Sequence, residues 1–354
     1  MADATAVVGG VDTHTDFHQA AVIDTTGRHL ATEAFPTTPD GYRRLLDWLR
    51  SHGEVQAVGV EGTGAYGAEL ARSLRADRVT VIDVDRPDRR ARRANGKSDP
   101  VDAYAAATAV LSGRAAGTPK TRDGVVEAIR SLRVVRRSAV KSRTQTINQI
   151  RTLIVTAPGE IREKLRGLPT SELIRQLARS RPGSDHADPA CAVRTALRRL
   201  ARRHQYLTEE IAEADAELKP LVAQTAPDLV ALPGVGTETA AQLLITAGDN
   251  PNRLRSEASF AHLCAAAPVP ASSGRTHRHR LNRGGDRQAN NALHTIALVR
   301  MRHDTRTKEY VARRTAEGMS KKDILRCLKR FIAREVYKHL ARQTIIRPPA
   351  LQTA

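Results

Sequence analysis

Several kinds of residue and segment are scarce in this chain of 354 residues. Aromatic residues make up only 3% of it, which excludes an aromatic platform for stacking the bases of single-stranded nucleic acid. Its three cysteines lie far apart without a CxxC pair, so neither a zinc knuckle nor a disulfide framework is indicated. No apolar run is as long as a membrane span, and no signal-peptide pattern opens the chain. We therefore expect a cytoplasmic protein with no membrane partner.

Acidic residues are outnumbered by basic ones, 38 against 57, which gives a formal net charge of +19. An excess of this size indicates a large anionic partner such as nucleic acid, and not a small acidic substrate. Lysine is scarce within the basic set, because 47 of the 57 residues are arginine. Arginine favours bidentate contacts with phosphate. A GC-rich genome would raise the arginine count equally well, so both explanations stay open.

Residues 6–112 alternate between strand-like and helix-like patterns. Apolar runs separated by a turn at Thr26-Gly27 predict three successive strands, over residues 7–12, 17–24 and 28–35. Further strands are predicted over residues 56–60 and 79–84, with helices over 39–51 and 65–74. The alternation predicts a mixed α/β sheet with helices on its faces. A three-strand meander followed by β–α units is the order of RNase H-like domains, although many α/β folds begin similarly.

Four carboxylates stand at the ends of these elements. Asp12 and Glu61 each close a predicted strand, while Asp99 and Asp102 lie three residues apart at the start of an Ala-rich helix and share one face of it. Two-metal phosphodiester chemistry needs carboxylates from several elements around cations about 3.5–4 Å apart. All four are candidate catalytic residues and Mg²⁺ ligands. The six basic residues between Arg86 and Lys97 are either a phosphate guide or a solvated helix face.

The segment over residues 118–225 is helical and rich in arginine. Asp188-Pro189 predicts the start of a helix, and Pro220 predicts its kink or end. Residues that are apolar except for His204 recur in this helix at spacings of four and three, the pattern of a coiled coil, at Val193, Leu197, Leu200, His204, Leu207, Ile211, Ala214, Leu218 and Leu221. We interpret this seam as a chain–chain contact of a homo-oligomer, with an antiparallel hairpin inside one chain as the alternative.

Two further motifs indicate nucleic-acid binding. The segment Leu229–Asp249 predicts two helices joined by a Pro-Gly-Val-Gly turn, in which Gly234 and Gly236 let a phosphate approach the backbone amides. A helical turn with a glycine cap is the alternative. Further on, Ser272 and Ser273 lie in a loop among arginines that we expect to contact phosphate, namely Arg275, Arg278, Arg280, Arg283 and Arg287. A serine among guanidinium groups could attack a phosphodiester, although Ser-Ser-Gly taken alone is usually a turn.

Together these motifs resemble the insertion-sequence one-ten transposases, also called bridge-RNA-guided recombinases, from about residue 6 to residue 340. The resemblance rests on VDTHTD, EGTGAY and KSDPVDA around the four acids, then on LPGVG, a Pro-Ser-Gly-basic stretch and an N-x-AL helix in the same order. It implies a RuvC-like domain of the RNase H fold that binds Mg²⁺ through Asp12, Glu61, Asp99 and Asp102. It also implies a structured guide RNA and a serine that joins covalently to DNA, Ser273 here, with Ser272 as the neighbouring alternative.

These expectations divide the chain into a RuvC-like catalytic domain (residues 1–117), a basic helical and coiled-coil segment (118–225), a mainly α C-terminal domain with a helix-hairpin-helix and the serine (226–342), and a tail (343–354). The expected function is a DNA transposase and recombinase working as a dimer or tetramer at the bacterial nucleoid. A RuvC-like nuclease that hydrolyses branched DNA and a non-enzymatic nucleic-acid-binding protein are the alternatives. Bare carboxylates count against the last, because they repel phosphate without a metal.

Overall fold

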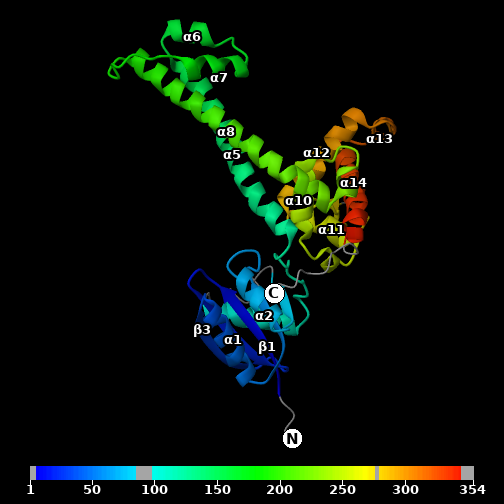
Figure 1. Ribbon diagram of the computed structural model, residues 1–354. Helices are drawn as coiled ribbons and strands as arrows, with labels where there is room; N and C mark the ends of the chain where they lie inside the picture. The colour runs from blue at the N-terminus through cyan, green and yellow to red at the C-terminus, as the bar shows by residue number, and fades with distance from the viewer. Residues whose placement is uncertain (1–4, 85–97, 276–278, 344–354) are drawn as a thin grey trace. The chain divides into compact units, whose positions relative to one another are not determined.

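The computed structural model describes residues 5–84, 98–275 and 279–343 of the chain (Figure 1). Two compact units make up the chain, Met1–Gly124 with Ala247–Ser256, and Val125–Thr246 with Glu257–Ala354. The predicted basic run at residues 86–97, Arg278, and all but the first residue of the predicted tail lie outside the described residues. None of the helices in the described part of the chain is long and apolar enough to cross a membrane.

The first unit is built on a mixed sheet in the order β3-β2-β1-β4-β5. β1 (Ala6–Thr13), β2 (Phe17–Asp24) and β3 (His29–Pro36) form an antiparallel meander. β4 (Glu54–Glu61) and β5 (Val81–Val84) then add to β1 in parallel. These bounds agree with the predicted strands to within two residues at every end. The mixed α/β sheet is confirmed, and its strand order is consistent with an RNase H-like fold.

Helices cover both faces of this sheet because residues that alternate along a strand point to opposite faces. α1 (Pro39–Ser51) and α2 (Ala68–Ala76) pack against the face that includes Val7 and Val11. α4 (Asp99–Leu111) packs against the opposite face, with Ala107 against Val8 and Ile23. The ring of Tyr104 in α4 stacks on His29 at the start of β3, with ring centroids 3.6 Å apart.

Gly10 in β1 allows α4 to approach the sheet closely. A Cβ atom at this position would lie 2.2 Å from the main-chain oxygen of Ala103 and 2.3 Å from the main-chain nitrogen of Ala107. Gly59 in β4 also allows α4 to approach closely, because a Cβ there would lie 2.9 Å from the carbonyl oxygen of Ala106. Backbone atoms cannot move away as a flexible side chain can, so these glycines set the distance between α4 and the strands that carry Asp12 and Glu61.

We expect Gly10→Ala to destabilise the first unit and to displace α4. Overpacking of a close contact of this kind costs about 3 kcal/mol, measurable as a lower free energy of unfolding in urea. The matched control is Gly159→Ala, because no heavy atom lies within 4 Å of a Cβ built there. Equal unfolding free energies for the two variants would contradict this account of the packing.

The second unit begins with two long helices, α5 (Val125–Thr156) and α8 (Pro189–Thr225), which lie side by side (Figure 1). The predicted cap is present, since the Asp188 carboxylate accepts hydrogen bonds from the amides of Ala190 and Cys191. α6 (Gly159–Leu165) and α7 (Thr170–Arg179) join the long helices and share a core with them that includes Ile150 and Leu197.

The predicted heptad seam packs inside the chain. Leu207 and Ile211 of α8 are buried against Ala139 of α5, and Leu197 is buried in the core shared with α6 and α7. The seam therefore follows the alternative prediction, a helical hairpin inside one chain. The interpretation of these side chains as a chain–chain contact is wrong. Pro220 lies inside α8 and does not end it, because the helix continues to Thr225. Because proline has no N–H group, one backbone hydrogen bond is missing within the last two turns of the helix.

Shorter helices complete the second unit. α9 (Pro227–Val230) and α10 (Thr237–Ala247) are followed by η1 (Pro251–Arg253), which belongs to the first unit, and by α11 (Glu257–Leu263). A short hairpin of β6 (Val269–Pro270) and β7 (His279–Arg280) precedes α12 (Arg287–His303), α13 (Thr305–Ala316) and α14 (Lys321–Gln343). α14 packs against α11 and α12, and its Arg330 forms an ion pair with Glu257 of α11 at 2.8 Å.

Candidate functional site

The four predicted acids lie at the ends of elements of the first unit. Asp12 is the last residue but one of β1, and Glu61 is the last residue of β4. Since β1 and β4 are parallel neighbours, both acids stand at the same edge of the sheet. Asp99 begins α4 and Asp102 follows within its first turn. The close packing of α4 on Gly10 brings the start of this helix to the same edge.

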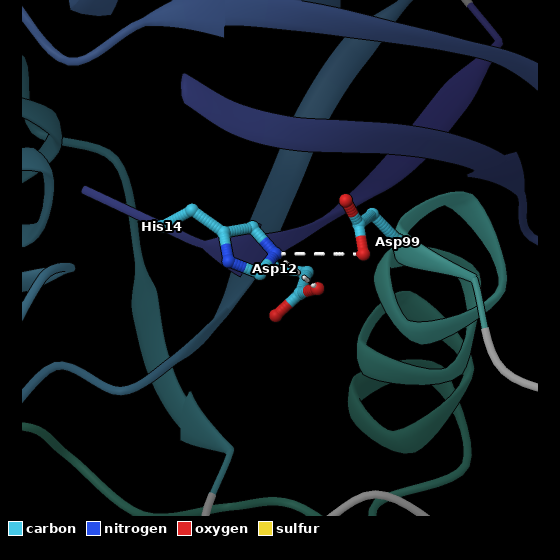
Figure 2. A group of neighbouring side chains, drawn as sticks. All are labelled: Asp12, His14 and Asp99. Atoms are coloured by element: carbon cyan, nitrogen blue, oxygen red, sulfur yellow. Dashed lines mark hydrogen bonds and ion pairs between the residues drawn. The ribbon is translucent and has the colours of Figure 1, made fainter. Parts of the chain in front are cut away.

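Asp12 and Asp99 meet around a third side chain, His14 (Figure 2). The Nε2 atom of His14 lies 3.1 Å from Oδ2 of Asp12 and 3.5 Å from Oδ1 of Asp99. One ligand atom from each of the three residues lies within 4.8 Å of the others. Glu61 and Asp102 are not members of this close group. Among the described residues, two of the predicted acids and one histidine therefore form a compact site that could hold a divalent cation.

The electrostatics of Asp12 fit a cation site. Burial raises the pKa of Asp12, His14 opposes this effect by its charge and hydrogen bond, and the carboxylates of Asp102 and Asp99 raise the pKa further. Asp102 is itself almost fully buried, at 3% exposure. Acids that crowd together and lose water repel one another, and a divalent cation relieves that repulsion. The donor set of carboxylate oxygens suits a hard divalent ion.

The loop after Glu61 supports this edge of the sheet. The hydroxyl of Thr13 donates to the main-chain oxygen of Glu61 at 2.8 Å and so ties the ends of β1 and β4 together. Gly62 has φ +71°, and Gly67 leaves room for Val60 and Thr13. The helix that the sequence predicts from residue 65 begins later, at Ala68, directly after Gly67. The main chain between Gly62 and Gly67 makes turns close to the acids.

Sequence reasoning missed His14 as part of the site, although a signal was present. Asp12 and His14 are two residues apart at the end of a strand, and side chains at that spacing point to the same side of the backbone. The pattern Asp-Thr-His could therefore have placed the imidazole beside the carboxylate.

A second histidine, His18 in β2, is fully buried, and its ring stacks on that of Tyr42. Burial lowers the pKa of His18 to about 4, and the nearby His14 adds to this effect. In the unfolded chain histidine takes up a proton near pH 6.5, so the unfolded state binds more protons than the folded state below that pH. We expect the free energy of unfolding to fall by up to about 3 kcal/mol as the pH drops from about 6.5 to 4. His18→Phe should remove this component in urea titrations, and an undiminished loss in the variant would refute it.

In the second unit the predicted serine lies in the connection between β6 and β7. Ser272 and Ser273 are exposed, and Gly274 beside them has φ +55°. The predicted phosphate contacts that the structure describes are also exposed, namely Arg275, Arg280, Arg283 and Arg287. A cavity of about 450 Å³ lies between this hairpin and α14, and its lining includes Arg280, Arg326, Lys329 and Arg330. The predicted arginines that the structure describes are thus on the surface.

Asn290, from the N-x-AL helix, fixes the base of this hairpin. Its amide nitrogen donates to the carbonyl oxygens of Cys264 and Ala265, each at 3.0 Å, and its Oδ1 accepts from Nζ of Lys329 at 2.9 Å. Gly285 is required beside it, because a Cβ there would lie 2.5 Å from the amide nitrogen of Ala265. Burial lowers the pKa of Lys329, and the charge of Arg326 adds to this effect. Asn290 therefore links α12 and α14 to the chain that leads into the hairpin.

The Pro-Gly-Val-Gly turn is held against α12. Gly234 has φ +74°, and a Cβ there would lie 3.2 Å from the carbonyl oxygen of Ile296. Arg300 of α12 donates from Nε to the carbonyl oxygen of Pro233 at 2.7 Å. Gly236 has open space around it, and its amide donates to the hydroxyl of Thr239 at 3.0 Å. Gly234 thus has a packing role that the sequence did not indicate, while phosphate binding at this turn stays a prediction.

Comparison with known proteins finds related sequences for segments of both units. A transposase model of the DEDD type, named for IS110, matches residues 9–157, and a model described as the transposase IS116/IS110/IS902 family matches residues 227–312. The chain is 26% identical over 329 residues to the mini-circle protein for IS117 of Streptomyces coelicolor, a match that covers 78% of this chain and 79% of that protein. It is 30% identical over 205 residues to the transposase for insertion sequence element IS1328 of Yersinia enterocolitica, covering 57% of each chain.

These matches define the class of the protein as an insertion-sequence transposase, an enzyme that acts on DNA. The first matched segment contains all four predicted acids, and the second contains the glycine turn and Ser273. Both matched segments are transposase domains of the IS110 family.

Proposed function

We propose that this transposase recombines DNA by transesterification, with Asp12, Glu61, Asp99 and Asp102 as its Mg²⁺ site and Ser273 as its nucleophile. The observation that carries the proposal is the convergence of Asp12 and Asp99 from β1 and α4, in a segment that matches DEDD-type transposases. The burial of Asp12 beside other acids supports a divalent cation as their common partner. The order of the strands supports the assignment of the sheet domain as RuvC-like.

In the proposed reaction the Oγ atom of Ser273 attacks a backbone phosphorus of the DNA. The Oγ–P bond forms, the bond from phosphorus to one sugar oxygen breaks, the serine hydroxyl releases its proton, and the leaving sugar oxygen takes one up. The phosphoserine bond keeps the energy of the broken phosphodiester. A sugar hydroxyl of a second strand then attacks the phosphoserine, which frees the serine and joins the two DNAs without consuming water.

The surrounding residues have defined parts in this reaction. A serine hydroxyl is a weak nucleophile until a base or metal activates it. Mg²⁺, when bound, would supply Lewis-acid stabilisation for the charge that develops on the phosphate. The exposed guanidinium groups of Arg275, Arg280, Arg283 and Arg287 would bind neighbouring phosphates and hold the strand in position.

The partners in this proposal are DNA, a structured guide RNA and further copies of the chain. The net charge of +19 supports binding to nucleic acid of either kind. We also propose that the turn at Gly234 and Gly236 acts as a helix-hairpin-helix contact to phosphate. A recombinase must hold two DNA partners at once, which supports a dimer or tetramer. Because α5 fills the seam of α8 within the chain, such an oligomer would form through other surfaces.

A covalent intermediate gives the test of this function. The protein is incubated with Mg²⁺ and DNA carrying the ends of its own element, the reaction is stopped with denaturant, and the products are separated on a denaturing gel. The expected result is a slowly migrating DNA species that protease treatment removes. Cleaved DNA with free ends and no attached protein would replace this proposal with the nuclease that hydrolyses DNA by water.

A further inference from the structure

His14 lies between the two carboxylates that anchor the proposed metal site (Figure 2). It directly follows β1, and its side chain is 51% exposed, so solvent and ions reach it. Its Nε2 atom is the group that contacts both Asp12 and Asp99, at 3.1 and 3.5 Å. The four-acid site of the proposed function does not include this nitrogen.

The two distances from Nε2 of His14 are close to the spacing of neighbouring ligands around one octahedral ion. With bonds of about 2.1 Å, ligand atoms at right angles lie about 3.0 Å apart, and opposite ones about 4.2 Å. Nε2 of His14 lies 3.1 Å from Asp12 and 3.5 Å from Asp99, so both distances are within about 0.5 Å of the first value. All three ligand atoms lie within 4.8 Å of one another. One cation can therefore contact all three groups after only small movements of their side chains.

We propose that His14 is a nitrogen ligand of the cation held by Asp12 and Asp99, and that it raises the affinity of this site for Mn²⁺ more than its affinity for Mg²⁺. The inference rests on the proposed function for the metal-binding role of the two acids. Mg²⁺ binds oxygen ligands and retains its waters strongly, whereas imidazole nitrogen is a ligand of the first-row transition ions. Mn²⁺ combines both properties, because it also binds carboxylates.

The competing interpretation is that His14 is only an ionic partner of the two acids. In that case the imidazole would move away when a cation binds, and its removal would leave the metal preference unchanged. The two interpretations differ in whether nitrogen is bonded to the metal, which can be measured without DNA and without turnover.

The test uses the full chain with Mn²⁺ alone. Binding is measured from the electron paramagnetic resonance signal of free Mn²⁺, pulsed measurements on the bound ion detect coupling to ¹⁴N, and calorimetry gives the affinity for Mg²⁺. We expect the wild type to show nitrogen coupling and His14→Ala to lose it. Even outer-shell partners of a metal change its affinity by about 10- to 100-fold, so the Mn²⁺ affinity of His14→Ala should fall about tenfold or more, with a smaller change for Mg²⁺.

Three further variants separate the outcomes. His14→Gln keeps a polar side chain and should behave as His14→Ala does, and His186→Ala in the loop before α8 is the matched control that should leave Mn²⁺ binding unchanged. If wild type and His14→Ala bind Mn²⁺ equally and neither shows nitrogen coupling, while Asp12→Asn loses the ion, the inference about His14 is overturned and the acidic site stands. If Asp12→Asn binds Mn²⁺ as tightly as the wild type, the proposed metal site itself fails.

Discussion

Replacing Asp12 by asparagine is expected to abolish strand cleavage and joining while DNA binding persists. The substitution removes the charge of the acid that lies beside Asp99 and His14 and is nearly isosteric, so the fold should be retained. Loss of metal stabilisation removes several kcal/mol from the transition state, and about 4 kcal/mol corresponds to a rate about a thousand times lower. The measurement is the rate of recombinant DNA formation, with DNA binding followed separately by fluorescence anisotropy.

The other three acids should follow Asp12 in the same assay. Glu61→Gln, Asp99→Asn and Asp102→Asn are each expected to remove most recombination. Asp47→Asn is the matched control, because Asp47 is an exposed acid of α1 outside the site. Wild-type activity in any two of the four variants would exclude a single four-acid site.

The second large effect is expected for Ser273→Ala, which should eliminate both the protein–DNA adduct and strand exchange. Without the Oγ atom the phosphoserine cannot form, so the loss should be complete within detection, while unfolding and DNA binding stay unchanged because Ser273 is exposed. Ser272→Ala is the neighbouring control and should have a milder effect. Mass spectrometry of the adduct after protease digestion identifies the modified serine.

Each other outcome has a specific meaning. An adduct mapped to Ser272 would shift the nucleophile by one residue and keep the covalent mechanism. Cleavage that survives Ser273→Ala without any adduct would instead support hydrolysis by water at the acidic site.

The sheet domain was largely predictable because its signals are local. Apolar alternation predicted all five strands, and the cap at Thr38 with Pro39 marks the start of α1 where the pattern places it. The convergence of Asp12 and Asp99 followed from their places at element ends. The part of His14 was not predicted, because the two-metal phosphodiester pattern consists of carboxylates alone. The role of Gly10 was also missed, since the backbone of α4 that it meets lies more than ninety residues along the chain.

The helical unit was harder to predict because one sequence pattern is compatible with two partners. A heptad seam indicates that α8 buries one stripe of side chains, but the stripe fits another chain or α5 equally well, and only the packing of Leu207 on Ala139 decides. In the same way, Gly234 indicates a positive φ without revealing that α12 occupies the space beside it. The nucleic-acid role of that turn and the nucleophilic role of Ser273 stay predictions.

The position of Pro220 gives the paired long helices a mechanical property. The part of α8 from Pro189 to Pro220 is about 46 Å long at the usual helical rise. Proline removes one backbone hydrogen bond, so α8 bends more easily near Pro220, close to its C-terminal end. A change of about 10° in direction there would displace the far end of α8 by about 8 Å, more than the axial rise of two base pairs of DNA. A small change of direction near Pro220 would therefore become a larger displacement at the end of α8 that begins at Pro189.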